Sequence, residues 1–132
     1  MGTDINEYLS AKGYADHVVR GGLRGLVRSW AAVAEGLARS NCAYILYEEF
    51  LNDVDGRRIL RECMERLTPT DLAQVSERVA EADRLFRENT VEISSCVWGD
   101  ETAIKHGYRP LVDWYYYRRP KVVDEAWPDE LL

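Results

Sequence analysis

Cysteine is scarce in this chain of 132 residues, and the positions of the cysteines do not suggest disulfide cross-links. The three cysteines, Cys42, Cys63 and Cys96, are odd in number and far apart in the sequence. Disulfide-dependent secreted domains contain an even number of cysteines, and structural zinc sites contain closely spaced pairs. The sequence therefore excludes a disulfide framework, disfavours a zinc site and predicts reduced thiols.

Long apolar runs are absent as well. No stretch approaches the roughly 20 apolar residues that a membrane-spanning helix needs. The first residues, Met1 to Asp4, lack the basic and apolar regions of a secretory signal. We therefore expect no membrane association and a cytoplasmic protein.

Motifs for catalysis, metals and phosphate loops are missing too. The glycine-rich stretch 21–25 lacks the Gly-Lys-Ser/Thr of a phosphate-binding loop. Neither His17 nor His106 has the preceding Glu of a di-metal bundle. The acidic stretch 48–55 has no partner His and no calcium-loop spacing, so it is typical of a solvated face. The sequence predicts no metal and no cofactor, and it leans against an enzyme.

What the chain does contain is typical of one globular domain over residues 1–132. Apolar types make up 46% and charged types 30% of the residues, and the length suits a single hydrophobic core. The net charge of −6 disfavours binding to nucleic acid, because the protein repels phosphate groups.

Apolar residues recur at helical spacing up to about residue 89 and predict an all-α fold. Three principal helices are expected, at 22–39, at 42–67 with a break near 52–56, and at 69–89, preceded by a short helix at 4–12. Two alternatives stay open. The first principal helix fits a start at Tyr14 as well as at Gly22, and residues 43–47 also fit a buried strand.

The third principal helix has the best-marked start. Thr68 supplies an N-cap hydroxyl, Pro69 occupies the first helical position, and Asp71 lies in the first turn. On its outer face, the spacing predicts surface pairs of Asp83 with Arg87 and of Arg84 with Glu88.

Beyond residue 90 glycine and proline interrupt the chain, and an irregular C-terminal wrap is expected at about 91–132. Many of the aromatic residues lie there, and because disordered segments are poor in aromatic side chains, the wrap should pack on the helices. Consecutive residues point in different directions, so the four from Trp114 to Tyr117 are not all expected to reach one core.

The stretch 105–121 is basic within an acidic protein, with a net charge of +4. Interleaved Trp, Tyr and Arg are the residue types that dominate binding hot spots. The stretch therefore fits two roles equally well, a lid over the helices or a surface for a partner. The candidate binding residues are Tyr108, Arg109, Trp114, Tyr116, Arg118 and Arg119.

Three stretches resemble a group of small bacterial all-helical proteins of undescribed function. Tyr47-Glu48-Glu49-Phe50-Leu51-Asn52-Asp53-Val54-Asp55-Gly56-Arg57 is similar to their aromatic-x-Asn-Asp segment. Asp83-Arg84-Leu85-Phe86 with Asn89-Thr90, and Trp114 to Pro120, resemble the elements that follow it. The resemblance implies an all-helical fold closed by an aromatic tail, and it implies no activity.

The same resemblance suggests which residues hold the tail. A charge-assisted network of Asn52, Asp53, Arg57 and Arg118 would fasten the closing segment to the second principal helix.

These observations favour a small acidic protein that acts by binding another protein, in the manner of an immunity protein, antitoxin or adaptor. The alternative is a small-ligand binder or enzyme with a pocket between the helices and the C-terminal segment, using Tyr116, Arg118, His106 and Cys96. In that reading Cys96 and His106 supply a thiolate and a base. Nucleic-acid binding through the basic aromatic stretch is a third possibility.

Overall fold

The computed structural model describes residues 2–40 and 45–132. Its described part is mostly helical and contains five α-helices: α1 (Gly2–Ala11), α2 (Asp16–Arg39), α3 (Tyr47–Met64), α4 (Pro69–Glu88) and α5 (Asp100–His106). The expectation of a helical fold is confirmed. The expected count of three principal helices and one short one is wrong, because α5 forms within the segment that was expected to be irregular.

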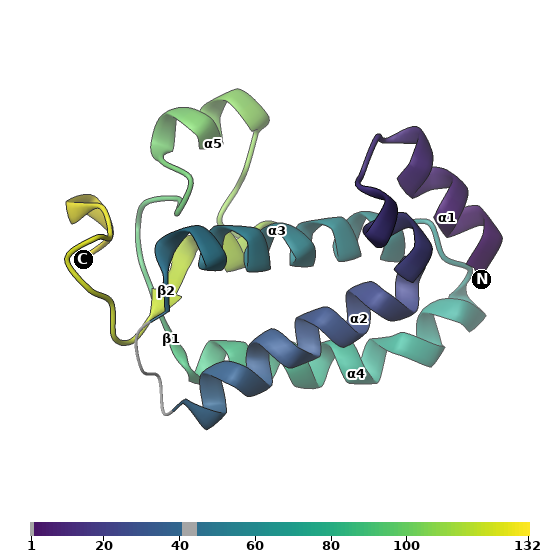
Figure 1. Cartoon of the computed structure of the whole chain (residues 1–132), viewed down its shortest axis with the longest axis horizontal. Helices are drawn as coiled ribbons and strands as arrows, with labels where there is room; N and C mark the ends of the chain where they lie inside the picture. Colours follow the sequence, from purple (N-terminus) through teal and green to yellow (C-terminus); the bar gives the residue numbers. More distant parts are fainter. Residues whose placement is uncertain (1, 41–44) are drawn as a thin grey trace.

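The three long helices form the body of the protein, and α2 packs against both α3 and α4 (Figure 1). Leu23, Leu26, Trp30 and Leu37 of α2 are buried, as the apolar spacing predicts. Val27 and Ala34 are buried as well, whereas Val19 and Val33 of the predicted apolar seam are only half-buried. Trp30 packs on Phe86 of α4, with 4.8 Å between ring centroids. None of the helices in the described residues is both long and apolar enough to cross a bilayer.

Both of the expected starts of α2 are reflected in its shape. The helix begins at Asp16, but Gly22 interrupts it with φ 59° and ψ −155°. A Cβ atom at Gly22 would lie 2.7 Å from the Oδ1 atom of Asn6 on α1. The left-handed backbone therefore requires glycine at this position, and any larger residue would also displace the Asn6 side chain.

The expected break in α3 is wrong. The helix runs without interruption from Tyr47 to Met64, through Asn52 and Gly56. Buried side chains on both sides of that stretch, including Phe50 and Leu60, hold it against the core. Tertiary packing outweighs weak helix propensity, which amounts to roughly 1 kcal/mol for a glycine. Of the alternative strand at 43–47, residues 43 and 44 lie outside the described residues, Ile45 and Leu46 belong to no helix or strand, and Tyr47 is helical.

The start of α4 is confirmed at Pro69. The Thr68 hydroxyl accepts a hydrogen bond from the Asp71 backbone amide at 3.2 Å, which satisfies one of the free donors of the first turn. The predicted surface pair of Arg84 and Glu88 is also present, at 2.7 Å.

The C-terminal wrap is more ordered than expected. Strand β1 (Thr90–Glu92) pairs antiparallel with β2 (Arg118–Pro120), with Val91 opposite Arg119. Between the strands lie α5, which stands away from the helical body in Figure 1, and the 3₁₀ turn η1 (Trp114–Tyr117). After β2, a second 3₁₀ turn, η2 (Asp129–Leu131), follows the buried Trp127.

Candidate functional site

The candidate binding residues do not share one exposed surface. Tyr116 is fully buried, and Arg109 is exposed. The other four are half-buried: Tyr108, Trp114, Arg118 and Arg119. A buried side chain cannot contact a partner unless the segment opens, so the packing of this stretch corresponds to the lid role more than to the surface role.

The three consecutive tyrosines 115–117 are all buried, whereas Trp114 is only half-buried. The reason is that η1 is covered from two sides. On one side its carbonyls accept hydrogen bonds from the 93–97 segment, with Val97 N donating to Tyr116 O at 2.8 Å. On the other, the Tyr116 hydroxyl reaches α3. Side chains that point in different directions are thus all enclosed.

The hydroxyl of Tyr116 is the main attachment of this segment to α3. It donates to Asp55 Oδ1 at 2.6 Å and accepts from Arg58 Nε at 2.9 Å. Burial, together with the neighbouring Asp55, raises the pKa of Tyr116, so the hydroxyl keeps its proton. Trp98 Nε1 also donates to Asp55 Oδ1, at 3.0 Å. Asp55 therefore anchors two aromatic side chains of the C-terminal segment.

Arg61 of α3 makes a second attachment to the C-terminal segment. Its guanidinium donates to Asp113 Oδ1 at 3.1 Å and to the Tyr115 hydroxyl at 3.3 Å. Burial raises the pKa of Tyr115 to about 12. Asp113 is itself buried, and its Oδ2 atom accepts from the Arg109 backbone amide at 3.1 Å.

The expected network of Asn52, Asp53, Arg57 and Arg118 is not formed. Arg118 instead donates to Thr90 Oγ1 at 2.7 Å and to backbone carbonyls. Asn52 is exposed, and burial together with Glu49 raises the pKa of Asp53 to about 6. The tail is fastened to the expected helix, but by Asp55, Arg58 and Arg61. These face the C-terminal segment, whereas Arg57 faces the core.

The buried Arg57 forms an ion pair with the half-buried Asp83 of α4, with Nε to Oδ1 at 2.9 Å and a second bond at 3.1 Å. Trp30 Nε1 of α2 donates to the same carboxylate at 2.8 Å. The pair therefore joins the three long helices. The predicted surface pair of Asp83 with Arg87 is wrong, because Asp83 turns inward and Arg87 lies over the ring of Trp114, 3.9 Å from its centroid.

A catalytic pair of Cys96 and His106 is not supported. Cys96 is buried, and burial raises the pKa of its thiol, which disfavours the reactive thiolate. His106 is exposed and stacks on Tyr108. In residues 2–40 and 45–132, no three His, Cys, Asp or Glu side chains gather in a way that could hold a metal ion.

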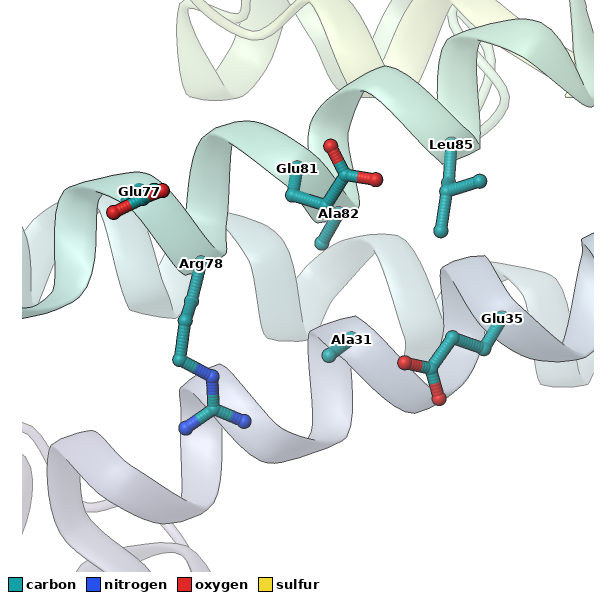
Figure 2. A pocket seen from close by; sticks show the side chains of 7 residues that line it. All are labelled: Ala31, Glu35, Glu77, Arg78, Glu81, Ala82 and Leu85. Atoms are coloured by element: carbon teal, nitrogen blue, oxygen red, sulfur yellow. The ribbon is translucent and has the colours of Figure 1, made fainter.

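Four cavities are described, and all lie on the long helices. Figure 2 shows one of about 290 Å³ between α2 and α4, where Glu35 and Arg78 approach from opposite sides. No residue beyond Glu88 lines any of the four. None of these four cavities is the pocket between the helices and the C-terminal segment that the sequence offered as an alternative.

The segment 100–113, which we call the α5 tip, exposes large apolar side chains. Ile104 is 84% exposed and Leu111 is 94% exposed. The loop that carries Leu111 is ordered by Asp113, whose amide donates to the Arg109 carbonyl at 2.7 Å. Lys105 and Arg109 are exposed beside these apolar residues in the sequence. The α5 tip thus displays apolar groups, two basic groups and, at its start, the carboxylates of Asp100 and Glu101 on a fixed backbone.

Sequence reasoning identified Arg109 and Tyr108 in this segment but missed Ile104 and Leu111. A signal was present, because neither aliphatic residue belongs to the helical apolar spacing that accounts for the core up to residue 89. Leu111 also follows Pro110 directly, and an aliphatic residue beside such a helix-breaking position is a candidate for exposure.

Comparison of the chain with protein-family models, with curated proteins and with solved structures found no match. The resemblance to small bacterial helical proteins stays a prediction.

Proposed function

We propose that this protein binds another protein through the α5 tip. The observation that carries the proposal is the near-complete exposure of Ile104 and Leu111 on a backbone held in place by hydrogen bonds. The function keeps the class expected from the sequence, an immunity-, antitoxin- or adaptor-like protein of the cytoplasm. The proposed contact surface differs from the expected one. It consists of the exposed aliphatic residues of the α5 tip and not of the aromatic residues of η1.

An exposed apolar side chain on an ordered loop favours binding for two reasons, namely the apolar area it can bury and the order that the loop already has. Single exposed aliphatic residues are common, but fully exposed leucine in an ordered loop gains nothing for folding. Burying it against a partner removes apolar area from water, worth about 2 kcal/mol for one leucine side chain. Because Asp113 already fixes the loop, binding does not have to pay for ordering it.

The charges around the tip define the chemistry of the partner surface. Asp100 and Glu101 are exposed at the start of α5, Lys105 and Arg109 are exposed next to Ile104 and near Leu111 in the sequence, and Asp113 is buried and paired with Arg61. The basic groups next to the two aliphatic residues favour a partner with an apolar pocket bordered by carboxylates. This differs from the basic partner that the net charge of the whole chain suggests, because local charge acts at contact distance.

The test is an affinity pull-down from the source cell, quantified by mass spectrometry, with wild-type protein and with Leu111→Asp and Ile104→Asp. Leu132→Asp is the matched control, because Leu132 is also an exposed leucine, 57% exposed, but lies at the other end of the C-terminal segment. A partner retained by wild type and by the control, and lost with both tip variants, is the expected result.

Circular dichroism of each variant shows that its helices are intact, since all three changes are at exposed positions. Equal capture by wild type and both tip variants would show that any partner binds elsewhere and would overturn the proposal. Equal loss with the Leu132 control would do the same, because it would indicate a general effect of added charge.

A further inference from the structure

A hollow of about 380 Å³ between α2 and α4 is lined by three arginines. Arg24 and Arg28 come from α2, and Arg78 comes from α4. Gln74 borders it as well, and the buried side chains of Val27 and Val75 form its floor. We call this the arginine hollow. No carboxylate is among its lining residues.

These three arginines differ from most other arginines of the chain. On α3 and in the second half of α4, guanidinium groups bind carboxylates, as Arg57, Arg58 and Arg84 do. Arg66 and Arg87 lie over aromatic rings. Within the described residues, Arg24, Arg28 and Arg78 make no ion pair or side-chain hydrogen bond.

Bringing three unpaired positive charges together is unfavourable for the protein alone. Arg24 and Arg28 are four residues apart on one helix, and like charges at that spacing destabilise the helix slightly. The concentration of positive charge is not a consequence of overall composition, because the chain carries −6. An anion in the hollow would relieve this repulsion.

We propose that the arginine hollow binds a phosphorylated small molecule with two or more adjacent negative charges. Guanidinium groups bind phosphate through two parallel N–H donors, and three of them suit neighbouring phosphate groups. Gln74 adds a neutral donor, and the valine floor accommodates an apolar part of the same molecule. The volume lies within the usual range of small-molecule sites.

The neighbouring cavity on the same helix pair argues for a small ligand over an extended one. It shares Arg78 with the arginine hollow but is lined by Glu35, Glu77 and Glu81 (Figure 2). A nucleic acid that followed the groove between α2 and α4 would meet these carboxylates directly after the arginines. A compact anion occupies the arginine hollow alone and avoids them.

The direct test is calorimetric titration of the full chain with inorganic pyrophosphate at low ionic strength. Wild type should bind, and Arg28→Gln and Arg78→Gln should each weaken binding about tenfold or more, since each removes charge-assisted hydrogen bonds. Arg39→Gln is the matched control, because Arg39 is an exposed arginine of α2 outside the hollow. Its affinity should equal that of wild type.

Absence of pyrophosphate binding by wild type would overturn the proposal, and so would equal weakening by the Arg39 control. A single-stranded oligonucleotide that binds more tightly than pyrophosphate, and is lost in the same two variants, would overturn the assignment to a small molecule.

Thermal unfolding gives a second readout that a merely solvated surface would not show. In low salt without anion, Arg28→Gln should unfold at a higher temperature than wild type, because it removes a repelling charge. At the same pyrophosphate concentration, the unfolding temperature of wild type should rise more than that of Arg28→Gln. An equal rise in both proteins would contradict the proposed site.

Discussion

The α3 side of the molecule and the outer face of α2 and α4 handle arginine in opposite ways. Where α3 meets the C-terminal segment, Arg58 and Arg61 are held by Glu62, Tyr116, Tyr115 and Asp113. In the arginine hollow, Arg24, Arg28 and Arg78 line a cavity with no carboxylate. The arginines of α3 therefore stabilise the fold, whereas the arginines of the hollow remain available to a ligand.

Among the charges that stabilise the fold, the ion pair between Arg57 and Asp83 should give the largest effect when it is removed. Asp83→Ala leaves Arg57 buried without its carboxylate and Trp30 without its acceptor. We expect the free energy of unfolding to fall by about 3 kcal/mol, measured by chemical denaturation. The control is Glu81→Ala, which breaks only an exposed pair with Arg84 and should cost far less than Asp83→Ala. Similar losses in the two variants would refute a special role for the pair of Arg57 and Asp83.

The attachment of the C-terminal segment is tested by Tyr116→Phe. The change keeps the ring and removes the hydroxyl that joins Asp55 to Arg58, so we expect a loss of about 2 kcal/mol on denaturation. Tyr117→Phe is the matched control, because its hydroxyl bonds only the neutral carbonyl of Tyr108 at 3.1 Å. Its loss should be about 1 kcal/mol or less. If Tyr117→Phe costs more, Asp55 is not the anchor.

At Asp53 we expect a smaller effect of opposite sign, because removing its charge should stabilise the folded protein at neutral pH. Burial and Glu49 raise its pKa from 3.8 to about 6, so the folded protein binds more protons than the unfolded chain in that interval. Its contribution to stability therefore falls as pH rises from about 4 to about 6. Asp53→Asn should be more stable than wild type at pH 7 by about 1 kcal/mol. This is less than the pKa shift alone implies, because the carboxyl keeps contact with solvent.

The measurement is denaturation of both proteins at pH 4 and pH 7, and the advantage of Asp53→Asn should shrink at the lower pH. Glu125→Gln, at an exposed carboxylate of the C-terminal segment, is the control and should change little at either pH. A loss of stability in Asp53→Asn at pH 7 would restore the tail-anchoring role that the sequence suggested for this residue.

The helices were predictable to the extent that their signals are local. The Thr68 cap and Pro69 mark the start of α4, and the apolar spacing of Leu23, Leu26 and Trp30 identifies the buried face of α2. The weak helix formers Asn52 and Gly56 gave a false break, because packing of Phe50 and Leu60 holds α3 together across them.

The candidate site was less predictable than the helices. The basic aromatic stretch was identified, but whether Tyr116 faces solvent or Asp55 depends on residues 61 positions apart in the chain. The arginine hollow combines Arg24 and Arg28 with Arg78, which only the packing of α2 on α4 brings together. No spacing rule within one helix connects such residues.

The sequence by itself determined that the chain is mostly helical, where α4 begins and which side of α2 is buried, because capping and apolar periodicity act within a few residues. The tertiary structure decided which charges are paired and which are free. That decision depends on distances between separate helices, as in the pairing of Asp83 with Arg57 and the exposure of Leu111 on the α5 tip. Pairing and burial follow from how elements pack, and local residue patterns do not encode them.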